Sequence, residues 1–328
     1  MITLKNESMT VCVDEEYGAT ITAVIDEHGV NALACYDWRS PIPARHSVSY
    51  GNDDLDFHSG YRGGWQETFP NAGLPSVVDG VPHPFHGEAA VSSWKVEHFS
   101  ELECELTVAA RSPLLLRRAM FLDPVLPVLR IEGEVRNEGH VEVDFVWGHH
   151  PAFPAVAGTV VDYPEGALCV PDDGRPGGLL NAEFSWPRAV STEGAPVDVS
   201  VVPDSFVHRL LYVHGLRESW AAVRQPEGLP SVALAWDLKA FPVSWLWVMR
   251  DDPGFPFYGR ARMLALEAQT SWPYDGLTGA RERNMAHTLA PGESMTSWYT
   301  MVLLSGGSGA VKHVDRSGHV ELVETCGG

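Results

Sequence analysis

LRIEGEVRNEGHVEVDFVW, residues 129–147, is the stretch that decides the fold class. Polar and mostly apolar residues alternate along 129–136, and they alternate again along 141–147. A period of two places successive side chains on opposite faces of a strand. Because Asn137-Glu138-Gly139 supplies turn residues between the two runs, the stretch predicts an antiparallel hairpin.

The same alternation recurs along much of the chain. Valine, tryptophan, tyrosine and phenylalanine are frequent in these runs, which suits a pleated surface with one buried face. No window carries a convincing apolar stripe of helical period over three turns. The pattern therefore predicts an all-β fold, a large antiparallel β-sandwich or barrel. The further runs are 101–110, 231–237, 243–249, 261–270 and 295–304.

The chain shows no internal repeat and no linker rich enough in glycine and serine to divide it. Residues 1–304 are therefore expected to form a single domain. Residues 305–328, with GGSG at 306–309, are expected to form a flexible C-terminal tail. The longest irregular stretches are 51–81 and 151–203, and long loops on a β scaffold usually carry the binding site.

Composition excludes several classes of protein. With 328 residues, 45% of them hydrophobic and 20% charged, the chain is globular rather than disordered or fibrous. Its formal net charge of −20 repels phosphate backbones and anionic lipid, so we expect neither a nucleic acid nor a membrane as partner. The cysteines are widely spaced, and the chain shows neither a signal-peptide pattern nor a membrane-spanning run, so a cytoplasmic location is expected.

Three clusters carry side chains suited to acid–base chemistry: HPFHGE at 83–88, WGHHPAF at 147–153 and LALEAQT at 264–270. In the third cluster, Glu267 lies in the middle of an alternating strand, with Leu264 and Leu266 on the opposite face. A carboxylate at the centre of an apolar strand is costly to bury unless it is partnered or used.

Each candidate also has a structural interpretation. His86 beside Gly87 is equally typical of a loop histidine that bonds the backbone. His150 before proline is typical of a strand end, and Glu267 of a half-exposed strand. A two-histidine, one-carboxylate metal site is a further alternative, with ligands among His83, His86, His149, His150 and Glu267. Against it, His149 and His150 are neighbours near a strand end and are expected to point in opposite directions.

Taken together, the clusters resemble the aldose 1-epimerase, or galactose mutarotase-like, family. The resemblance rests on five motifs in the family's order, spanning roughly residues 51–304. They are RGGWQETFPNAG at 62–73, HG at 86–87 followed by Trp94, HPAF at 150–153, EAQT at 267–270 and PGES at 291–294.

This resemblance implies an all-β supersandwich that interconverts the α and β anomers of a free sugar without a cofactor. By the same resemblance, Glu267 matches the general base that takes the proton of the anomeric hydroxyl. His150 matches the acid that protonates the ring oxygen, and His86 matches the second histidine, which hydrogen-bonds the sugar. Asp204, in PDSF at 203–206, resembles the substrate-binding aspartate.

The chemistry agrees with these roles. Mutarotation takes one proton from O1 and delivers another to O5, so that the C1–O5 bond opens. A carboxylate of pKa about 4 and an imidazole of about 6.5 supply opposite protonation states near neutral pH. Each positioned proton transfer contributes about 10²–10⁴-fold, and no step demands a metal.

The remaining candidates concern substrate binding. Trp65 and Trp94 are expected to stack on the sugar, with packing in the core as the alternative for Trp94, and Gln269 shares the face of Glu267. Arg62 resembles the phosphate-binding arginine of the hexose-6-phosphate epimerase branch. An anionic sugar, phosphorylated or sulfonated, is therefore the second functional hypothesis, and a non-catalytic sugar-binding protein the third. The expected partner is a small sugar, bound by a monomer or homodimer.

Overall fold

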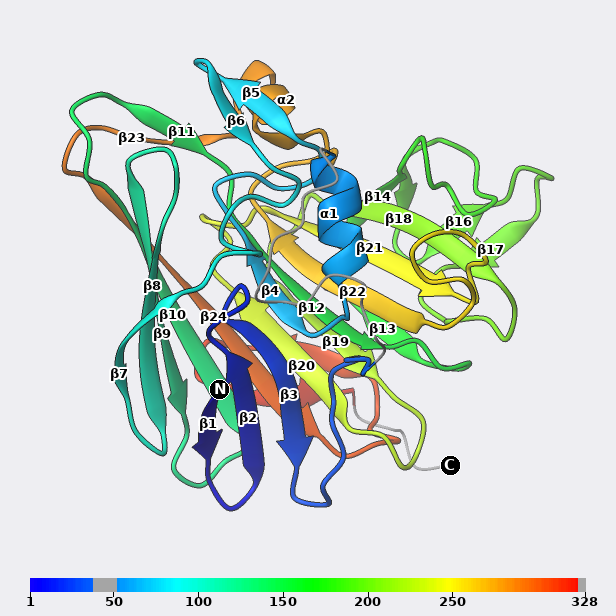
Figure 1. The fold of residues 1–328 in the computed structure, drawn as a ribbon. Coiled ribbons are helices and arrows are strands. Elements are labelled where there is room, and N and C mark those ends of the chain that lie inside the picture. Colours follow the sequence, from blue (N-terminus) through cyan, green and yellow to red (C-terminus); the bar gives the residue numbers. More distant parts are fainter. Residues whose placement is uncertain (38–51, 324–328) are drawn as a thin grey trace.

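The computed structural model describes residues 1–37 and 52–323, and in them the chain folds into two stacked antiparallel sheets (Figure 1). The larger sheet runs β1 (Ile2–Lys5), β2 (Met9–Asp14), β3 (Thr20–Asp26), β4 (Trp65–Thr68), β12 (Gly148–Pro154), β22 (Arg262–Gln269), β21 (Val243–Arg250), β18 (Val207–His214), β14 (Leu168–Pro171) and β15 (Phe184–Ser185). The smaller sheet runs β13 (Val160–Asp162), β19 (Trp220–Arg224), β20 (Ser231–Trp236), β24 (Ser294–Leu304), β10 (Val128–Asn137), β9 (Leu114–Leu122), β8 (Glu103–Ala109) and β7 (Lys95–Phe99). The large antiparallel sandwich predicted from the alternation is therefore confirmed.

Small elements decorate the two sheets. Three are hairpins: β5 (Ser76–Val78) with β6 (Val81–His83), β16 (Arg188–Val190) with β17 (Pro196–Asp198), and β25 (Val311–Val314) with β26 (Val320–Leu322). A further two-stranded sheet pairs β11 (Val143–Phe145) with β23 (His287–Leu289), which lie far apart in the sequence. The helices are α1 (Asp53–Gly60) and α2 (Gly276–Glu282). Neither of these helices, in the part of the chain that the structure describes, is long and apolar enough to cross a membrane.

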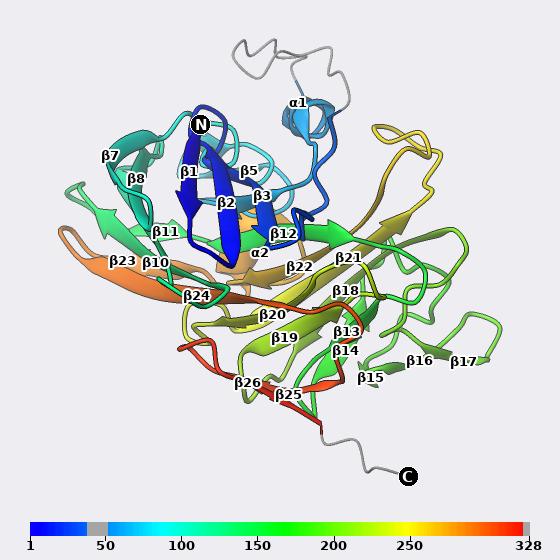
Figure 2. The same ribbon diagram turned by 90° about the horizontal axis from the view of Figure 1, so that it is seen from below.

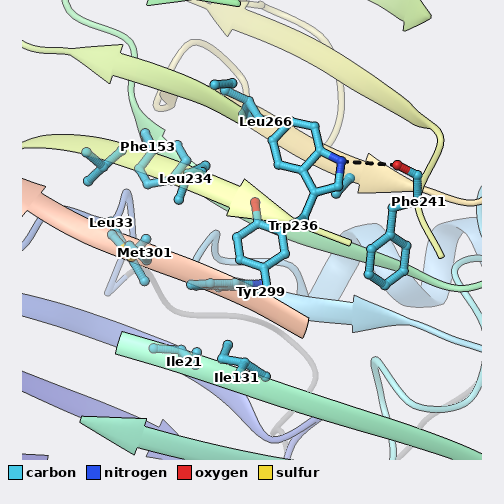
Figure 3. Close-up of a cluster of buried hydrophobic side chains, with 14 of the residues drawn as sticks. Ile21, Leu33, Ile131, Phe153, Leu234, Trp236, Phe241, Leu266, Tyr299 and Met301 are labelled. Carbon is cyan, nitrogen blue, oxygen red and sulfur yellow. Dashed lines mark hydrogen bonds between the residues drawn. The ribbon is translucent and has the colours of Figure 1, made fainter. Parts of the chain in front are cut away.

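The core lies between the two sheets, as Figure 3 shows. Leu266 and Phe153 come from the larger sheet, and Trp236 and Tyr299 face them from the smaller one. The indole N–H of Trp236 donates to the carbonyl of Phe241 at 3.1 Å, which satisfies the polar atom of this ring in an apolar setting. The alternation thus gives each central strand one face for this core.

The hairpin predicted over 129–147 is wrong. Strand β10 pairs along almost its whole length with β9 on one side and with β24 on the other. No edge of β10 is therefore left to pair with residues 141–147. The chain then leaves the sheet, and β11 pairs with β23 instead. Asn137 ends β10 by binding the carbonyls of Val141 and Leu289 through its amide. Alternation identifies strands, but it does not identify their partners.

Helix α1 lies in the stretch 51–81, which was expected to be irregular. The side chain of Asn52 accepts a hydrogen bond from the amide of Leu55 and caps the helix. With only eight residues and little amphipathic contrast, this helix escapes a search for apolar stripes. In Figure 2, α1 lies on one side of the larger sheet, and β19 and β20 lie on the other.

The segment 305–328, expected as a flexible tail, contains β25 and β26 in its described part. Val311 and Val314 are buried there against Trp220 and Val302, on the face of the smaller sheet that points away from the core. The glycines of 306–309 precede this hairpin rather than a structureless end.

We predict that Val314→Ala lowers the free energy of unfolding by about 2 kcal/mol, because it removes two buried methyl groups and leaves a cavity. Val323→Ala is the matched control, since Val323 is 49% exposed. Equilibrium unfolding in urea measures both. Equal, negligible effects of the two substitutions would contradict the packing of this hairpin.

Candidate active site

The strands β12 and β22 bring together a histidine and a glutamate from distant parts of the sequence. In their antiparallel register, Ala152 lies opposite Ala265. Two residues away on the same face, His150 therefore lies opposite Glu267. His150 Nε2 is 3.3 Å from Glu267 Oε1, and both side chains are almost fully buried. On the other side of Glu267, strand β21 contributes Trp245 as its direct cross-strand neighbour.

The neighbouring histidine points the other way. His149 is buried in the core, where its Nδ1 accepts a hydrogen bond from Trp65 Nε1 at 3.3 Å and its ring packs against Tyr299. The expectation that His149 and His150 diverge is therefore confirmed. Among the described residues, no group of three or more histidine, cysteine, aspartate or glutamate side chains is close enough together to hold a metal ion.

A second layer of hydrogen bonds fixes the carboxyl group of Glu267. Gln269 Nε2 donates to Glu267 Oε2 at 3.0 Å, and Gln269 Oε1 accepts from the hydroxyl of Thr68 at 3.2 Å. The space for this amide comes from Gly148, because a Cβ there would lie 1.8 Å from Gln269 Oε1. Gln269 thus holds the glutamate instead of lining the pocket.

His86 reaches the site from a tight loop. Its φ of +60° is left-handed, and the following Gly87 has φ of +77°. A Cβ on Gly87 would lie 2.2 Å from the carbonyl oxygen of Phe69, so only glycine fits. The amide of Gly73 donates to His86 Nδ1 at 3.1 Å, which leaves the proton of a neutral ring on Nε2. The His86 ring centroid is 5.3 Å from that of His150.

Asn71 ties this loop to its surroundings. Its amide nitrogen donates to the carbonyls of Leu74 and Pro84, both at 2.9 Å. Its side-chain oxygen accepts from the amide of Leu277, at the start of α2, at 2.7 Å. One buried side chain therefore connects the loop that carries His86 with the segment that carries Tyr274.

The three side chains line one pocket, which is open to solvent. Its floor is the face of the larger sheet that points away from the core, and its walls are loops and α1. The other lining residues are mostly aromatic or cationic: Phe57, His58, Tyr61, Phe85, Arg175, His208, Leu210, Trp245, Trp247, Phe255, Pro256, Phe257 and Tyr274.

Burial governs the protonation of the pair. Desolvation raises the pKa of Glu267 to about 8, although the hydrogen bond from Gln269 and the charge of Arg175 oppose this rise. Desolvation lowers the pKa of His150 to about 4, and that of His86 well below its usual value. Between about pH 4 and pH 8 the pair therefore holds one proton, which Glu267 carries at rest. In the free side chains the order of the two pKa values is the opposite, because histidine has the higher pKa.

Besides Gln269, four more of the predicted substrate-binding residues do not line the pocket. Asp204 is exposed and pairs with Arg250 at 2.7 Å. Trp65 is fully buried in the core, and Trp94 donates to the carbonyl of Ala89 at 2.9 Å from a buried position. Both tryptophans are therefore core residues, which for Trp94 is the alternative stated above. Arg62 also lies outside the pocket, where its charge acts on Tyr17 and Cys35.

Several pocket residues carry weak signals in the sequence. Tyr61 directly precedes the glycine-rich motif, and its hydroxyl lies 3.4 Å from His150 Nδ1. Arg175 belongs to PDDGRPGG, within a long stretch expected to carry the site, but no pattern distinguishes it from its neighbours. His58 and His208 each pair with an aspartate, which only the folded chain reveals.

Similarity to other proteins is detected in structure alone, since no protein-family model and no curated protein matches this sequence. A proposed aldose 1-epimerase from Escherichia coli K12 superimposes with a TM-score of 0.61 at 19% identity, covering 92% of this chain and 98% of its own. A galactose mutarotase-like protein from Lactobacillus casei has a TM-score of 0.62 at 16% identity, covering 93% of this chain and 100% of its own. A galactose mutarotase related enzyme from Lactobacillus acidophilus has a TM-score of 0.58 at 14% identity, covering 93% and 97%.

These likenesses define the class of structure. The chain has the galactose mutarotase-like fold, an antiparallel β-sandwich, and the fold implied by the sequence motifs is confirmed. At 14–19% identity, the likenesses concern the fold and do not extend to catalysis or substrate.

We predict that Gln269→Leu raises the pKa of Glu267 above its value of about 8, because the carboxylate loses its hydrogen-bond donor. Such a bond favours a charged group by about 1.5–3 kcal/mol. Carbon-13 NMR of labelled glutamate carboxyl groups measures the titration, with Glu267→Gln assigning the signal. Thr68→Val, which only frees the amide, gives a smaller rise. An unchanged or lower pKa in Gln269→Leu would show that this bond does not tune the glutamate.

Proposed function

We propose that the protein is an aldose 1-epimerase, which interconverts the α and β anomers of a sugar by acid–base ring opening. The observation that carries the proposal is the contact of 3.3 Å between His150 and Glu267 inside an aromatic pocket. A proton donor and a proton acceptor side by side match a reaction that moves one proton off O1 and one onto O5.

In the proposed reaction, Glu267 takes the proton of the anomeric O1–H while His150 gives a proton to the ring oxygen O5. The C1–O5 bond breaks as the C1=O1 double bond forms, and the open aldehyde turns about C1–C2. The hydroxyl O5 then attacks the other face of C1, and both protons return. The pair regains its starting state, so the cycle consumes nothing.

The pair requires its proton on His150 for this direction of transfer. Gln269 and Arg175 both favour the carboxylate form of Glu267, and a neutral pair passes its proton across the 3.3 Å contact without a net change of charge. In either arrangement the pair offers one donor and one acceptor. The low dielectric of a buried site strengthens the hydrogen bonds along which the protons move.

The surroundings suit a sugar. His86 presents Nε2–H as a donor near His150, and Tyr61 adds a hydroxyl. Trp247 and Phe257 offer faces to the C–H groups of a pyranose, in the role first expected of Trp65 and Trp94. A non-catalytic sugar-binding protein would need these rings but not the buried acid–base pair, whose desolvation is costly.

Replacing Glu267 with Gln is predicted to reduce catalysed anomer exchange at least about 100-fold, because the amide keeps the shape but neither accepts nor carries the proton. Polarimetry or NMR exchange on fresh α-glucose and α-galactose measures the rate. Glu321→Gln is the matched control, since Glu321 is exposed on β26, far from the pocket. A Glu267→Gln variant as fast as the parent would exclude Glu267 as the acid–base residue.

The pH dependence follows from the pair. Below about pH 4 His150 gains a proton and the pair has no acceptor; above about pH 8 Glu267 loses its proton and the pair has no donor. The catalysed kcat/KM for a neutral sugar is therefore expected to be bell-shaped between these limits. Exchange is measured from pH 3 to 10 after subtraction of the uncatalysed rate. A profile that stays flat across both limits would contradict this account.

A further inference from the structure

Arg175 is the one arginine side chain among the described residues that line the pocket. Its guanidinium lies over the ring of Tyr274, with 4.8 Å between the guanidinium carbon and the ring centroid. This contact holds one face of the planar group. Within the described residues the guanidinium forms no ion pair and no hydrogen bond, so its N–H donors are available to a ligand.

The backbone fixes this arginine in place. Leu210, itself in the pocket wall, donates its amide to the carbonyl of Arg175 at 2.9 Å. The amide of Asp172 donates to the carbonyl of Leu210, also at 2.9 Å. The loop after β14 is therefore held to strand β18 at two points, and Arg175 is presented from the scaffold rather than from a free loop.

The carboxylates that feel the charge of Arg175 already have closer partners. Asp54 pairs with His58 Nδ1 at 2.8 Å, and Glu267 accepts from Gln269 at 3.0 Å. Neither is in an ion pair with Arg175. A buried or half-buried arginine usually has an anionic partner, and here the described part of the chain supplies none in direct contact.

Two further imidazoles line the pocket together with Arg175. His58 and His208 each bind an aspartate through Nδ1, Asp54 and Asp252 respectively. An aspartate on Nδ1 fixes the orientation of the ring. Each ring then has only Nε2 left for a ligand. In a chain of net charge −20, the described residues that line the pocket include one arginine and four imidazoles, and Glu267 is their only carboxylate.

We propose that the sugar bound in this pocket carries an anionic group, and that Arg175 binds that group. The proposal rests on the proposed function and names its substrate class: an aldose with a carboxylate, sulfonate or phosphate away from C1. Bidentate pairing of guanidinium with an oxyanion supplies both affinity and orientation. It also gives a role to an arginine side chain that has no anionic partner among the described residues.

This assignment differs from the one first expected for an anionic sugar. Arg62 was the candidate from the sequence motif, but it lies outside the pocket that holds His150 and Glu267. Arg175 and the pair share one cavity, so a single sugar reaches both.

The test compares anomer exchange of glucose, glucose 6-phosphate, glucuronate and a 6-sulfonated glucose in the parent, Arg175→Gln and Arg62→Gln. Arg188→Gln, an exposed residue on β16, controls for loss of charge. We expect the parent to prefer an anionic sugar over glucose in kcat/KM. In Arg175→Gln this preference falls about 10- to 100-fold, mainly through KM. Glucuronate carries a planar carboxylate, whereas the phosphate and the sulfonate are tetrahedral, so the three rates show which shape of anion Arg175 prefers.

Equal exchange of glucose and all anionic sugars by the parent would overturn the proposal and leave the epimerase function standing. A lost preference in Arg62→Gln, with Arg175→Gln like the parent, would overturn it too. If the parent exchanges no sugar, the epimerase function fails, and calorimetric binding of the same four sugars decides this inference separately. Anionic sugars that bind the parent about 10-fold or more tighter than Arg175→Gln would support it; equal affinities would overturn it.

Discussion

The contact between His150 and Glu267 is the interaction on which the site depends, and it exists only because two central strands impose it. Each ionised group alone costs several kcal/mol to bury. Side by side they remain neutral by sharing one proton, so burial is tolerated and the proton stays available for transfer. The hydrogen bonds of Gln269 and Gly73 then fix which atoms of the glutamate and of His86 face the pocket.

The same strands form both the core and the site, because one face of each strand packs between the sheets and the other face lines the pocket. Along β22, Leu264 and Leu266 pack between the sheets, whereas Glu267 faces the pocket. Along β12, adjacent histidines divide in the same manner, one into the core and one into the site. Loops and α1 cover the face of the sheet that carries His150 and Glu267. This cover desolvates the two side chains and so shifts their pKa values.

Sequence patterns predicted the parts of this arrangement that depend on alternation and short motifs. The strands, the opposite directions of the two histidines, and the residues that meet in the pocket, His86, His150 and Glu267, were all accessible in this way. Strand partners were not, because β10 has the same alternation whichever strand pairs with it. Tyr61 and Arg175 were inaccessible because loops place them, and a loop has no period. Trp65 was expected to stack on the sugar but lies in the core, because a tryptophan in a sequence is equally typical of a core and of a sugar-binding surface.

A structure with bound sugar tests the central claim most directly. Crystals of the Glu267→Gln variant, soaked with glucose or with an anionic hexose, trap a sugar that does not turn over. The account predicts a pyranose whose O1 lies within hydrogen-bond distance of residue 267 and whose O5 lies within that distance of His150. A sugar bound elsewhere, a ring with C1 turned away from both side chains, or an empty pocket at saturating sugar would contradict it.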